Sequence, residues 1–341
     1  MKYLNFYTTL LSGIFFTSCV PAQEDFKADF TIAFGSCNNQ FMENHLWSAI
    51  KDNDPNVFIW GGDVIYSDTF DPKVLEKNYQ KQLQNATYVN FSESVDILGT
   101  WDDHDYGDND AGAEYPLKDV SQKLFLDFLK TGADDPIWLQ KGIYDSKLYT
   151  VNGHVIKIIL LDTRYFRSSL TRAEGGKKRY TPNVYGEGTI LGETQWGWLR
   201  NELEKSKADF NIIMSSIQVL SSEHGFETWG NMPHEVDQLL QLISDSKAKN
   251  VILLSGDRHI AEISSKKTEA LSYPLIDFTS SGMTHSYSAF KGEPNQYRIS
   301  RVVAEKNFGL LKIDFSANQV LMEIKGEKNV TFDKYLQVYP K

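Results

Sequence analysis

Cysteine is rare in this 341-residue sequence, which contains only Cys19 and Cys37. Cys19 falls in a segment that we predict to be a leader, where it is either lipidated or removed. A mature exported chain with a single thiol forms no internal disulfide, so the disulfide-rich secreted scaffolds are excluded. Cys37 is then either a small buried residue or a metal thiolate, and its neighbours have to decide between the two.

Two hydrolase signatures are also missing. The sequence has no Gly-x-Ser-x-Gly elbow, which argues against a serine hydrolase. His234-Glu235 lacks the second histidine of the zinc-protease motif.

Positive charge is scarce as well, since the sequence has 35 Lys and Arg against 45 Asp and Glu, for a formal net charge of −10. General nucleic-acid binding is disfavoured, because a phosphate backbone is held mainly by Lys and Arg.

Long apolar runs are absent, and the N-terminal one, residues 10–16 (LLSGIFF), is too short for a membrane-spanning helix. It has the length of a signal-peptide core. Residues 16–19 (FTSC) resemble a bacterial lipobox, in which the cysteine is lipidated and becomes the new N-terminus. Cleavage after Ala22 by an ordinary signal peptidase is the alternative. We therefore predict a signal peptide of lipoprotein type over residues 1–22. The protein is expected in the periplasm or at the cell surface, anchored to the outer membrane by a lipid on Cys19.

The rest of the chain, residues 26–341, is expected to form a single α/β domain. Overall, 41% of the residues are hydrophobic, which supplies a large core. Apolar runs of strand length alternate with segments of helical spacing, the pattern of buried strands covered by helices. The last two strands are close enough to form a hairpin. Strands are predicted over residues 30–34, 57–60, 95–98, 155–161, 210–214, 251–254, 275–278, 308–315 and 320–324, and helices over 41–50, 74–83, 117–129, 193–205 and 235–246.

Polar residues follow six of these predicted strands directly. In α/β sheets, ligands bind beyond the carboxyl ends of the strands, so the six segments are expected to build one site. The irregular stretch 164–192 is expected to be a surface loop over that site. The six segments are residues 35–39, 61–63, 101–110, 162–164, 215–218 and 255–259.

Five residues of these segments are candidate metal ligands. Asp63, Asp103 and Asp257 offer the carboxylate oxygens that hard cations prefer, and His259 and Cys37 are softer ligands. Any single aspartate after a strand is also explained as a helix N-cap. Three of them arriving together with a histidine favour a metal site.

Tyr66 and the acidic segment 101–110 refine the metal prediction. Tyr66 follows Asp63 by three residues and is either a core residue or a phenolate ligand, which with a thiolate suits a ferric ion. The segment 101–110 holds five aspartates, which repel one another unless water or cations screen them. Its spacing does not match the EF-hand loop, although its composition suits calcium.

Four motifs then carry a family resemblance. Read in order, they resemble the motifs of the PhoD-type alkaline phosphatases and phosphodiesterases, which belong to the calcineurin-like metallophosphatase superfamily. The resemblance spans about residues 30–315, nearly all of the predicted mature chain. The motifs are residues 34–37 (FGSC), 61–66 (GGDVIY), 100–110 (TWDDHDYGDND) and 255–259 (SGDRH).

The resemblance implies a four-layer α/β/β/α sandwich with two mixed central sheets. It also implies a multinuclear site that holds Fe³⁺ and Ca²⁺, although other divalent metals also suit these ligands. Asp63 would bridge metals, and Cys37 and Tyr66 would complete the iron site. The remaining coordination would be shared by Asp103, Asp257 and His259.

Two further residues are predicted to act on the substrate. By the resemblance, His104 falls where the superfamily often has an acid or a phosphate-contacting histidine; alternatively it only orients a metal ligand. Arg164 is a candidate for a bidentate fork to phosphate oxygens, or else forms a structural ion pair with Asp162 or a loop acid. Gln218 departs from the superfamily pattern, which often has a histidine ligand at that position.

These features predict metal-assisted hydrolysis of phosphate mono- or diesters by a hydroxide that the cations generate from water near neutral pH. A phospholipase-type phosphodiesterase acting on lipid head groups is one alternative, and a non-catalytic, calcium-dependent binding lipoprotein is another. Residues 223–234 are either a wall on the substrate side or surface packing, and His285 follows another strand end.

Overall fold

The computed structural model describes residues 26–340. The predicted signal peptide, residues 1–22, and its lipidation site Cys19 lie outside the described residues. In the described range, no helix is both long enough and apolar enough to cross a bilayer.

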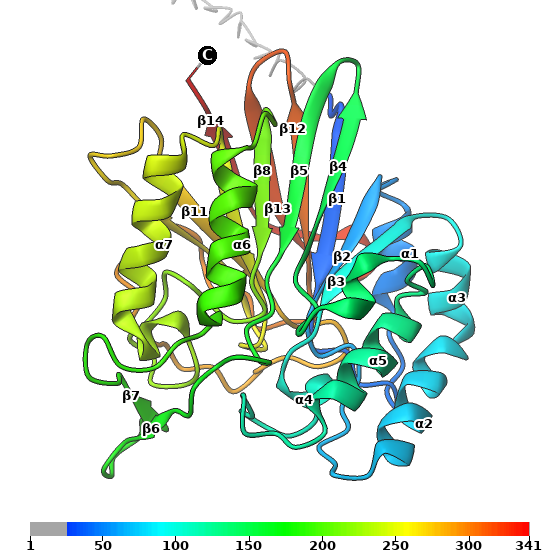
Figure 1. Ribbon diagram of the computed structural model, residues 1–341. Helices are drawn as coiled ribbons and strands as arrows, with labels where there is room; N and C mark the ends of the chain where they lie inside the picture. Colours follow the sequence, from blue (N-terminus) through cyan, green and yellow to red (C-terminus); the bar gives the residue numbers. More distant parts are fainter. Residues whose placement is uncertain (1–25, 341) are drawn as a thin grey trace, which may run out of the picture.

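Two six-stranded mixed sheets form the centre of the molecule, as predicted (Figure 1). The first has the order β14-β13-β12-β1-β2-β3, in which β1, β2 and β3 are parallel. The second has the order β10-β11-β9-β8-β5-β4, in which β11, β9, β8 and β5 are parallel. The strands of the first sheet are β1 (Phe30–Gly35), β2 (Val57–Gly61), β3 (Asp96–Thr100), β12 (Phe308–Asp314), β13 (Gln319–Lys325) and β14 (Thr331–Val338). Those of the second are β4 (Asp145–Val151), β5 (His154–Leu160), β8 (Phe210–Met214), β9 (Val251–Ser255), β10 (Ala261–Lys266) and β11 (Leu275–Ser280).

Helices cover the outer face of each sheet, which completes the four layers (Figure 1). On the first sheet these helices are α1 (Leu46–Lys51), α2 (Pro72–Leu83), α3 (Ala86–Ser92) and α5 (Lys118–Phe128). On the second they are α6 (Gly192–Glu204) and α7 (Pro233–Ser246). One-turn helix α4 (Asp103–Tyr106) follows β3, short 3-10 turns occur at Pro136–Leu139, Trp229–Asn231 and Glu327–Asn329, and β6 (Thr171–Arg172) pairs with β7 (Tyr180–Thr181) in the loop 164–192.

The alternation of side chains along the strands divides the core into layers. On β1, Phe30, Ile32 and Phe34 point between the two sheets, whereas Ala33 faces the helices. On β8, Ile212 lies between the sheets and Ile213 packs under α6 and α7. Successive residues of a strand point to opposite faces, so strands that are apolar throughout are buried on both sides.

All nine predicted strands and all five predicted helices are present within a few residues, and β12 and β13 form the predicted hairpin. The prediction missed β4, β10 and β14. Each of these is the edge strand of its sheet and has a mixed or polar sequence. β4 and β14 are largely exposed, and β10 is buried over its first four residues but has the polar sequence AEISSK, so none of the three has a continuous apolar run to detect.

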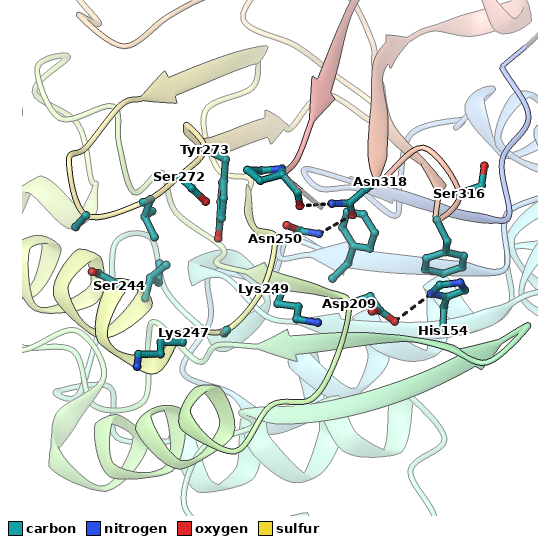
Figure 2. Close-up of a pocket in the computed structure, with 17 residues that line it drawn as sticks. His154, Asp209, Ser244, Lys247, Lys249, Asn250, Ser272, Tyr273, Ser316 and Asn318 are labelled. Carbon is teal, nitrogen blue, oxygen red and sulfur yellow. Dashed lines mark hydrogen bonds and ion pairs between the residues drawn. The ribbon is translucent and has the colours of Figure 1, made fainter.

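The parallel strands of both sheets end at the same side of the molecule, at the bottom of Figure 1. At the opposite end, a cavity of about 590 Å³ opens beside the starts of β5 and β8 and the β12–β13 turn (Figure 2). Its side chains are tied to one another, for example His154 to Asp209 at 3.3 Å and Asn250 to Asn318 at 2.9 Å. This cavity contains none of the predicted site residues.

Gly62 shows how tightly the strand ends are packed. Its φ is +95°, and a Cβ there would lie 2.4 Å from Cβ of Asp102 and 2.9 Å from its backbone nitrogen. We expect Gly62→Ala to lower the free energy of unfolding by about 3 kcal/mol, from backbone strain and overpacking together. Gly153, with φ +85° but no atom within 4 Å of its Cβ position, is the matched control and should lose only about 1 kcal/mol as Gly153→Ala. Urea unfolding measures both, and equal losses would contradict the packing argument.

Candidate metal centre

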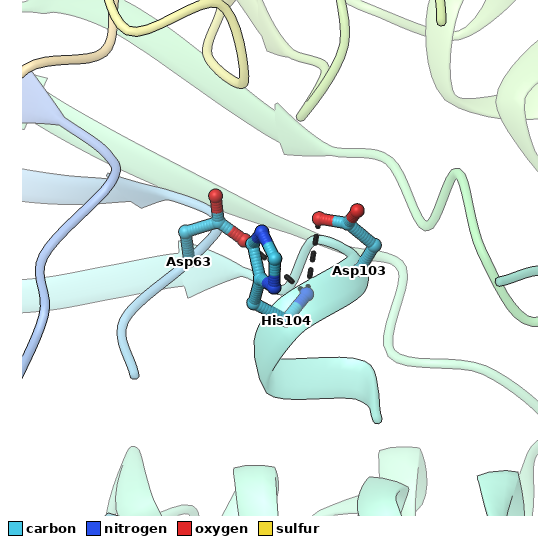
Figure 3. Close-up of side chains that lie close together, drawn as sticks. All are labelled: Asp63, Asp103 and His104. Carbon is cyan, nitrogen blue, oxygen red and sulfur yellow. Dashed lines mark hydrogen bonds between the residues drawn. The ribbon is translucent and has the colours of Figure 1, made fainter. Parts of the chain in front are cut away.

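Three of the predicted carboxylates converge beyond the strand ends. Asp63 follows β2, Asp103 begins α4 after β3, and Asp257 follows β9 of the other sheet. Ligand atoms of Asp63, Asp103 and His104 lie within 4.8 Å of one another, as do those of Asp102, Asp103 and Asp257. Figure 3 shows the first of these groups, with the backbone N–H of His104 between the two carboxylates. Asp103 belongs to both groups and joins the two sheets.

Cys37 and Tyr66 both contact Asp63. The Sγ atom of Cys37 lies 3.5 Å from Oδ2 of Asp63, and the hydroxyl of Tyr66 lies 3.2 Å from the same oxygen. Burial raises the pKa of the Cys37 thiol well above its usual value, and the charges of Asp63 and Asp257 raise it further. Burial and the charge of Asp63 likewise raise the pKa of Tyr66. Both groups therefore need a cation beside them before they ionise.

A tight turn after β9 supplies Asp257 and His259, whose φ values are +67° and +54°. Gly256 permits this turn, because a Cβ there would lie 2.5 Å from the carbonyl oxygen of Gly61. The ring of His259 lies 6.4 Å from that of Tyr66, and its buried Nδ1 has no hydrogen-bond partner in the described part of the chain. Burial, with the nearby His285 and His104, lowers the pKa of His259 to about 4, so the imidazole is neutral and free to bind a metal.

The charges of this centre fit bound cations. Burial raises the pKa of Asp63 well above its usual value and that of Asp257 to about 7, because like-charged groups share a site with little water. Within residues 26–340, no lysine or arginine forms an ion pair with Asp63, Asp103 or Asp257. Carboxylates, a thiol, a phenol and an imidazole together make a donor set for a hard cation beside a softer one.

His104 is held beside the carboxylates by Asp68, a residue that the sequence did not single out. Its Nδ1 lies 2.7 and 2.8 Å from the two carboxylate oxygens of Asp68, and its ring lies 4.2 Å from that of Tyr66. Burial lowers the pKa of His104, but the carboxylates of Asp103, Asp63 and Asp68 outweigh burial and raise it to about 11. The ring is therefore protonated when only these carboxylates surround it. Its role as an acid stays a prediction.

Arg164 occupies a position that favours the ion-pair alternative. It is fully buried; its Nε donates to Asp102 at 2.7 Å and its Nη1 lies 2.6 Å from Glu227. Asp162 accepts a hydrogen bond from the backbone N–H of Arg164 and none from its guanidinium. The guanidinium thus lies behind the metal candidates, and this arrangement gives no support to a phosphate fork.

Gln218 is also buried, and its side chain is hydrogen-bonded within the core. Its amide donates to Glu262 at 2.9 Å and to Thr279 at 2.8 Å. At the position where the superfamily often has a histidine ligand, this chain therefore has a buried structural hydrogen bond.

A pocket of about 420 Å³ opens on the centre and contains residues that the sequence did not identify. Its walls include Asp103, His104, Asp257, His259 and His285, together with Asn109, Asp110, Arg179, Phe226, Glu227, Arg258, Ser286 and Tyr287. The loop 164–192 contributes Arg179, and the segment 223–234 contributes two wall residues while its Trp229 is in the core. Most of the new wall residues lie in segments that the sequence had marked, namely 101–110, 164–192, 223–234 and 255–259, but nothing in the sequence singled out these residues within them.

Comparisons with known proteins identify the family and the fold. A family model described as PhoD-like phosphatase matches residues 32–320. Alkaline phosphatase D of Bacillus subtilis (strain 168) is 26% identical over 289 residues, which cover 73% of this chain and 49% of that protein. The chain thus spans about half the length of this curated relative.

Solved structures share the fold. A structure of PhoD has a TM-score of 0.71 at 17% identity, covering 91% of this chain and 68% of its own. GAP50, the anchor in the inner membrane complex of Plasmodium, has a TM-score of 0.59 at 14% identity, with coverages of 92% and 90%. A dimetal phosphatase from Danio rerio has a TM-score of 0.54 at 13% identity, with coverages of 92% and 100%.

The buried pairs of Arg164 give a stability prediction. Arg164→Met leaves the carboxylates of Asp102 and Glu227 buried with one counter-charge fewer, and should lower the free energy of unfolding by about 3–5 kcal/mol. Arg200→Met removes an exposed pair with Glu204 and should cost less than about 0.5 kcal/mol. Denaturant titration compares the two variants. If both variants lose a similar free energy of unfolding, the buried ion pairs of Arg164 do not stabilise the fold more than an exposed pair does.

Proposed function

The chain belongs to the PhoD-like phosphatase family, and on this premise we propose that it is an exported, metal-dependent phosphoesterase that hydrolyses phosphate mono- or diesters. The observation that carries this proposal is the position of Asp103, which lies within ligand distance of Asp63 on one side and of Asp257 on the other and lines one pocket with Asp257 and His259. We further propose that residues 26–341 form one catalytic domain.

The proposed ligands divide by chemistry. Cys37, Tyr66 and Asp63 would hold Fe³⁺, because a thiolate and a phenolate favour a ferric ion. Asp103, Asp257 and His259 would share the remaining coordination, and Asp63 would bridge the metals; the carboxylate oxygens of this group suit Ca²⁺. The contacts of 3.5 and 3.2 Å that Cys37 and Tyr66 make with Asp63 support the first group. Bound cations of this kind lower the pKa of water and neutralise phosphate charge.

The chain's own groups would then position and protonate the substrate. His104 lies at the pocket wall, and Asp68 fixes the orientation of its ring. A protonated imidazole in this place can donate to the leaving oxygen of an ester. The backbone N–H groups of His104 and Asp110 donate to the carboxylate of Asp103 at 3.0 and 2.7 Å and would keep it in place.

Metal-dependent turnover tests the function directly. Purified protein should hydrolyse a chromogenic phosphate monoester or diester, and a chelator should abolish turnover because it removes the cations that activate water and neutralise phosphate charge. Asp63→Asn should reduce kcat/KM by about 100-fold or more, whereas Asp127→Asn, an exposed acid of α5, should have no effect. The ratio of mono- to diesterase activity identifies the ester class. Absence of metal-dependent turnover on both classes would refute the enzyme proposal.

Iron content tests the ligand assignment separately. Cys37→Ser replaces the sulfur that lies 3.5 Å from Asp63 with a harder oxygen. Elemental analysis should find less iron per chain and unchanged calcium in this variant. If its iron content equals that of the wild type, Cys37 is only a small buried residue, and hydrolysis by another metal pair remains to be assigned.

A further inference from the structure

Arg258 lies in the wall of the catalytic pocket, between the ligand candidates Asp257 and His259 in sequence. Only 7% of its surface is exposed. Its guanidinium lies over the ring of Phe226, 4.4 Å from the centroid, and its Nη2 lies 2.7 Å from Glu293. In residues 26–340, nothing accepts a hydrogen bond from its buried Nε.

The turn after β9 explains why Arg258 faces away from the metal ligands. Asp257 and His259 both have left-handed backbone conformations, and the N–H of Arg258 donates to the carbonyl of Gly256 at 2.8 Å. Asp257 reaches Asp103, whereas Arg258 reaches Phe226 and Glu293. One turn therefore places a carboxylate, Asp257, and a guanidinium, Arg258, in the wall of the same pocket.

The bonding of Arg258 is incomplete. A guanidinium has five N–H donors in a planar fork, and Glu293 takes up only Nη2. A buried donor without a partner is costly, so a ligand oxygen at this point would gain a charge-assisted hydrogen bond. The ring of Phe226 excludes water on one side and stabilises the positive charge.

A second guanidinium extends the same wall. Arg179 of the loop 164–192 lies 5.7 Å from the centroid of Phe226 and pairs with Asp110 at 2.7 Å. Phe226 thus has two guanidinium groups over it in a pocket whose other wall is acidic. At about 420 Å³, the pocket has room for more than the phosphoryl group at the metal ligands.

The geometry points to a second anion subsite at Arg258, which selects phosphate esters that carry another anionic group, a carboxylate or a phosphate, besides the phosphoryl group that is hydrolysed. This inference rests on the proposed function, since it names the substrate class of the same site. Arg258 is a specificity-determining residue in this scheme, and Glu293 orients it.

A matched pair of substrates tests the subsite. Glycerol 3-phosphate and 3-phosphoglycerate are both phosphate monoesters of a three-carbon unit, and only the second has a carboxylate. The metal-loaded wild type should favour 3-phosphoglycerate by about 10-fold in kcat/KM, the value of one charge-assisted hydrogen bond. Arg258→Met should abolish this preference, and Arg258→Lys, which keeps the charge but loses the fork, should retain part of it.

Arg301→Met is the matched control, because Arg301 is an exposed arginine that also lies over an aromatic ring, Phe332, at 5.6 Å. It should keep the preference. Thermal melting by circular dichroism verifies that each variant is folded. A wild type without the preference, or a folded Arg258→Met that keeps it, would overturn the subsite.

Binding of non-hydrolysable anions separates this inference from the function itself. Calorimetry on the metal-loaded protein compares methylphosphonate with phosphonoacetate, which differ by one carboxylate. Phosphonoacetate should bind about 10-fold more tightly to the wild type and lose this advantage in Arg258→Met. If the wild type hydrolyses no ester but shows this pattern, the function fails and the subsite stands. Equal affinities for the two anions in an active wild type refute the subsite alone.

Discussion

Mutual repulsion among buried carboxylates is the constraint on which the rest of this structure depends. The chain brings Asp63, Asp102, Asp103, Asp105 and Asp257 to the ends of two sheets, where burial removes the water that would screen them. Such a cluster folds only if counter-charges come with it. The chain provides these counter-charges in two ways. Arg164 and Arg167 pair with Asp102 and Glu227, and His104, whose pKa the neighbouring carboxylates raise to about 11, lies beside Asp63 and Asp103. Asp63, Asp103 and Asp257 pair with no lysine or arginine among the described residues, so bound cations would supply the remaining positive charge. The acids thus divide by position into a group that pairs with arginines and a group of candidate metal ligands.

The family match and the arrangement of the acidic side chains both support a metal-dependent phosphoesterase. The family model covers residues 32–320, and all the residues that the resemblance assigns to metals lie around the same site in space. The chain nevertheless spans about half the length of its curated relative, so its substrate has to be found from its own pocket. Arg258 and Phe226 are features of that pocket that do not follow from the metal ligands.

The sequence predicted the central strands and the acids that directly follow them, and it missed residues whose role depends on partners that are distant in the chain. Continuous apolar runs such as 251–254 identify central strands because both faces are buried, whereas the edge strands β4, β10 and β14 have no such run. The acids were found because they follow strands directly. Asp68, which orients His104, sits in a loop whose sequence gives no reason to choose it. For Arg164, the residue type suits either a phosphate or an ion pair, and only the positions of Asp102 and Glu227, which lie 62 and 63 residues away in the chain, favour the ion pair.

The candidate ligands of the metal centre come from segments that are far apart in the chain. Cys37 and Asp63 follow strands of the first sheet, and Asp257, whose carbonyl lies 3.6 Å from the Cys37 sulfur, follows a strand of the second. Contacts between residues this far apart in sequence form late in folding, because the entropy of closing the long loop has to be offset first. A partly synthesised or partly folded chain therefore holds only fragments of the ligand set. The complete set of candidate ligands therefore exists only once the two sheets have docked, which couples any metal binding here to the last step of folding.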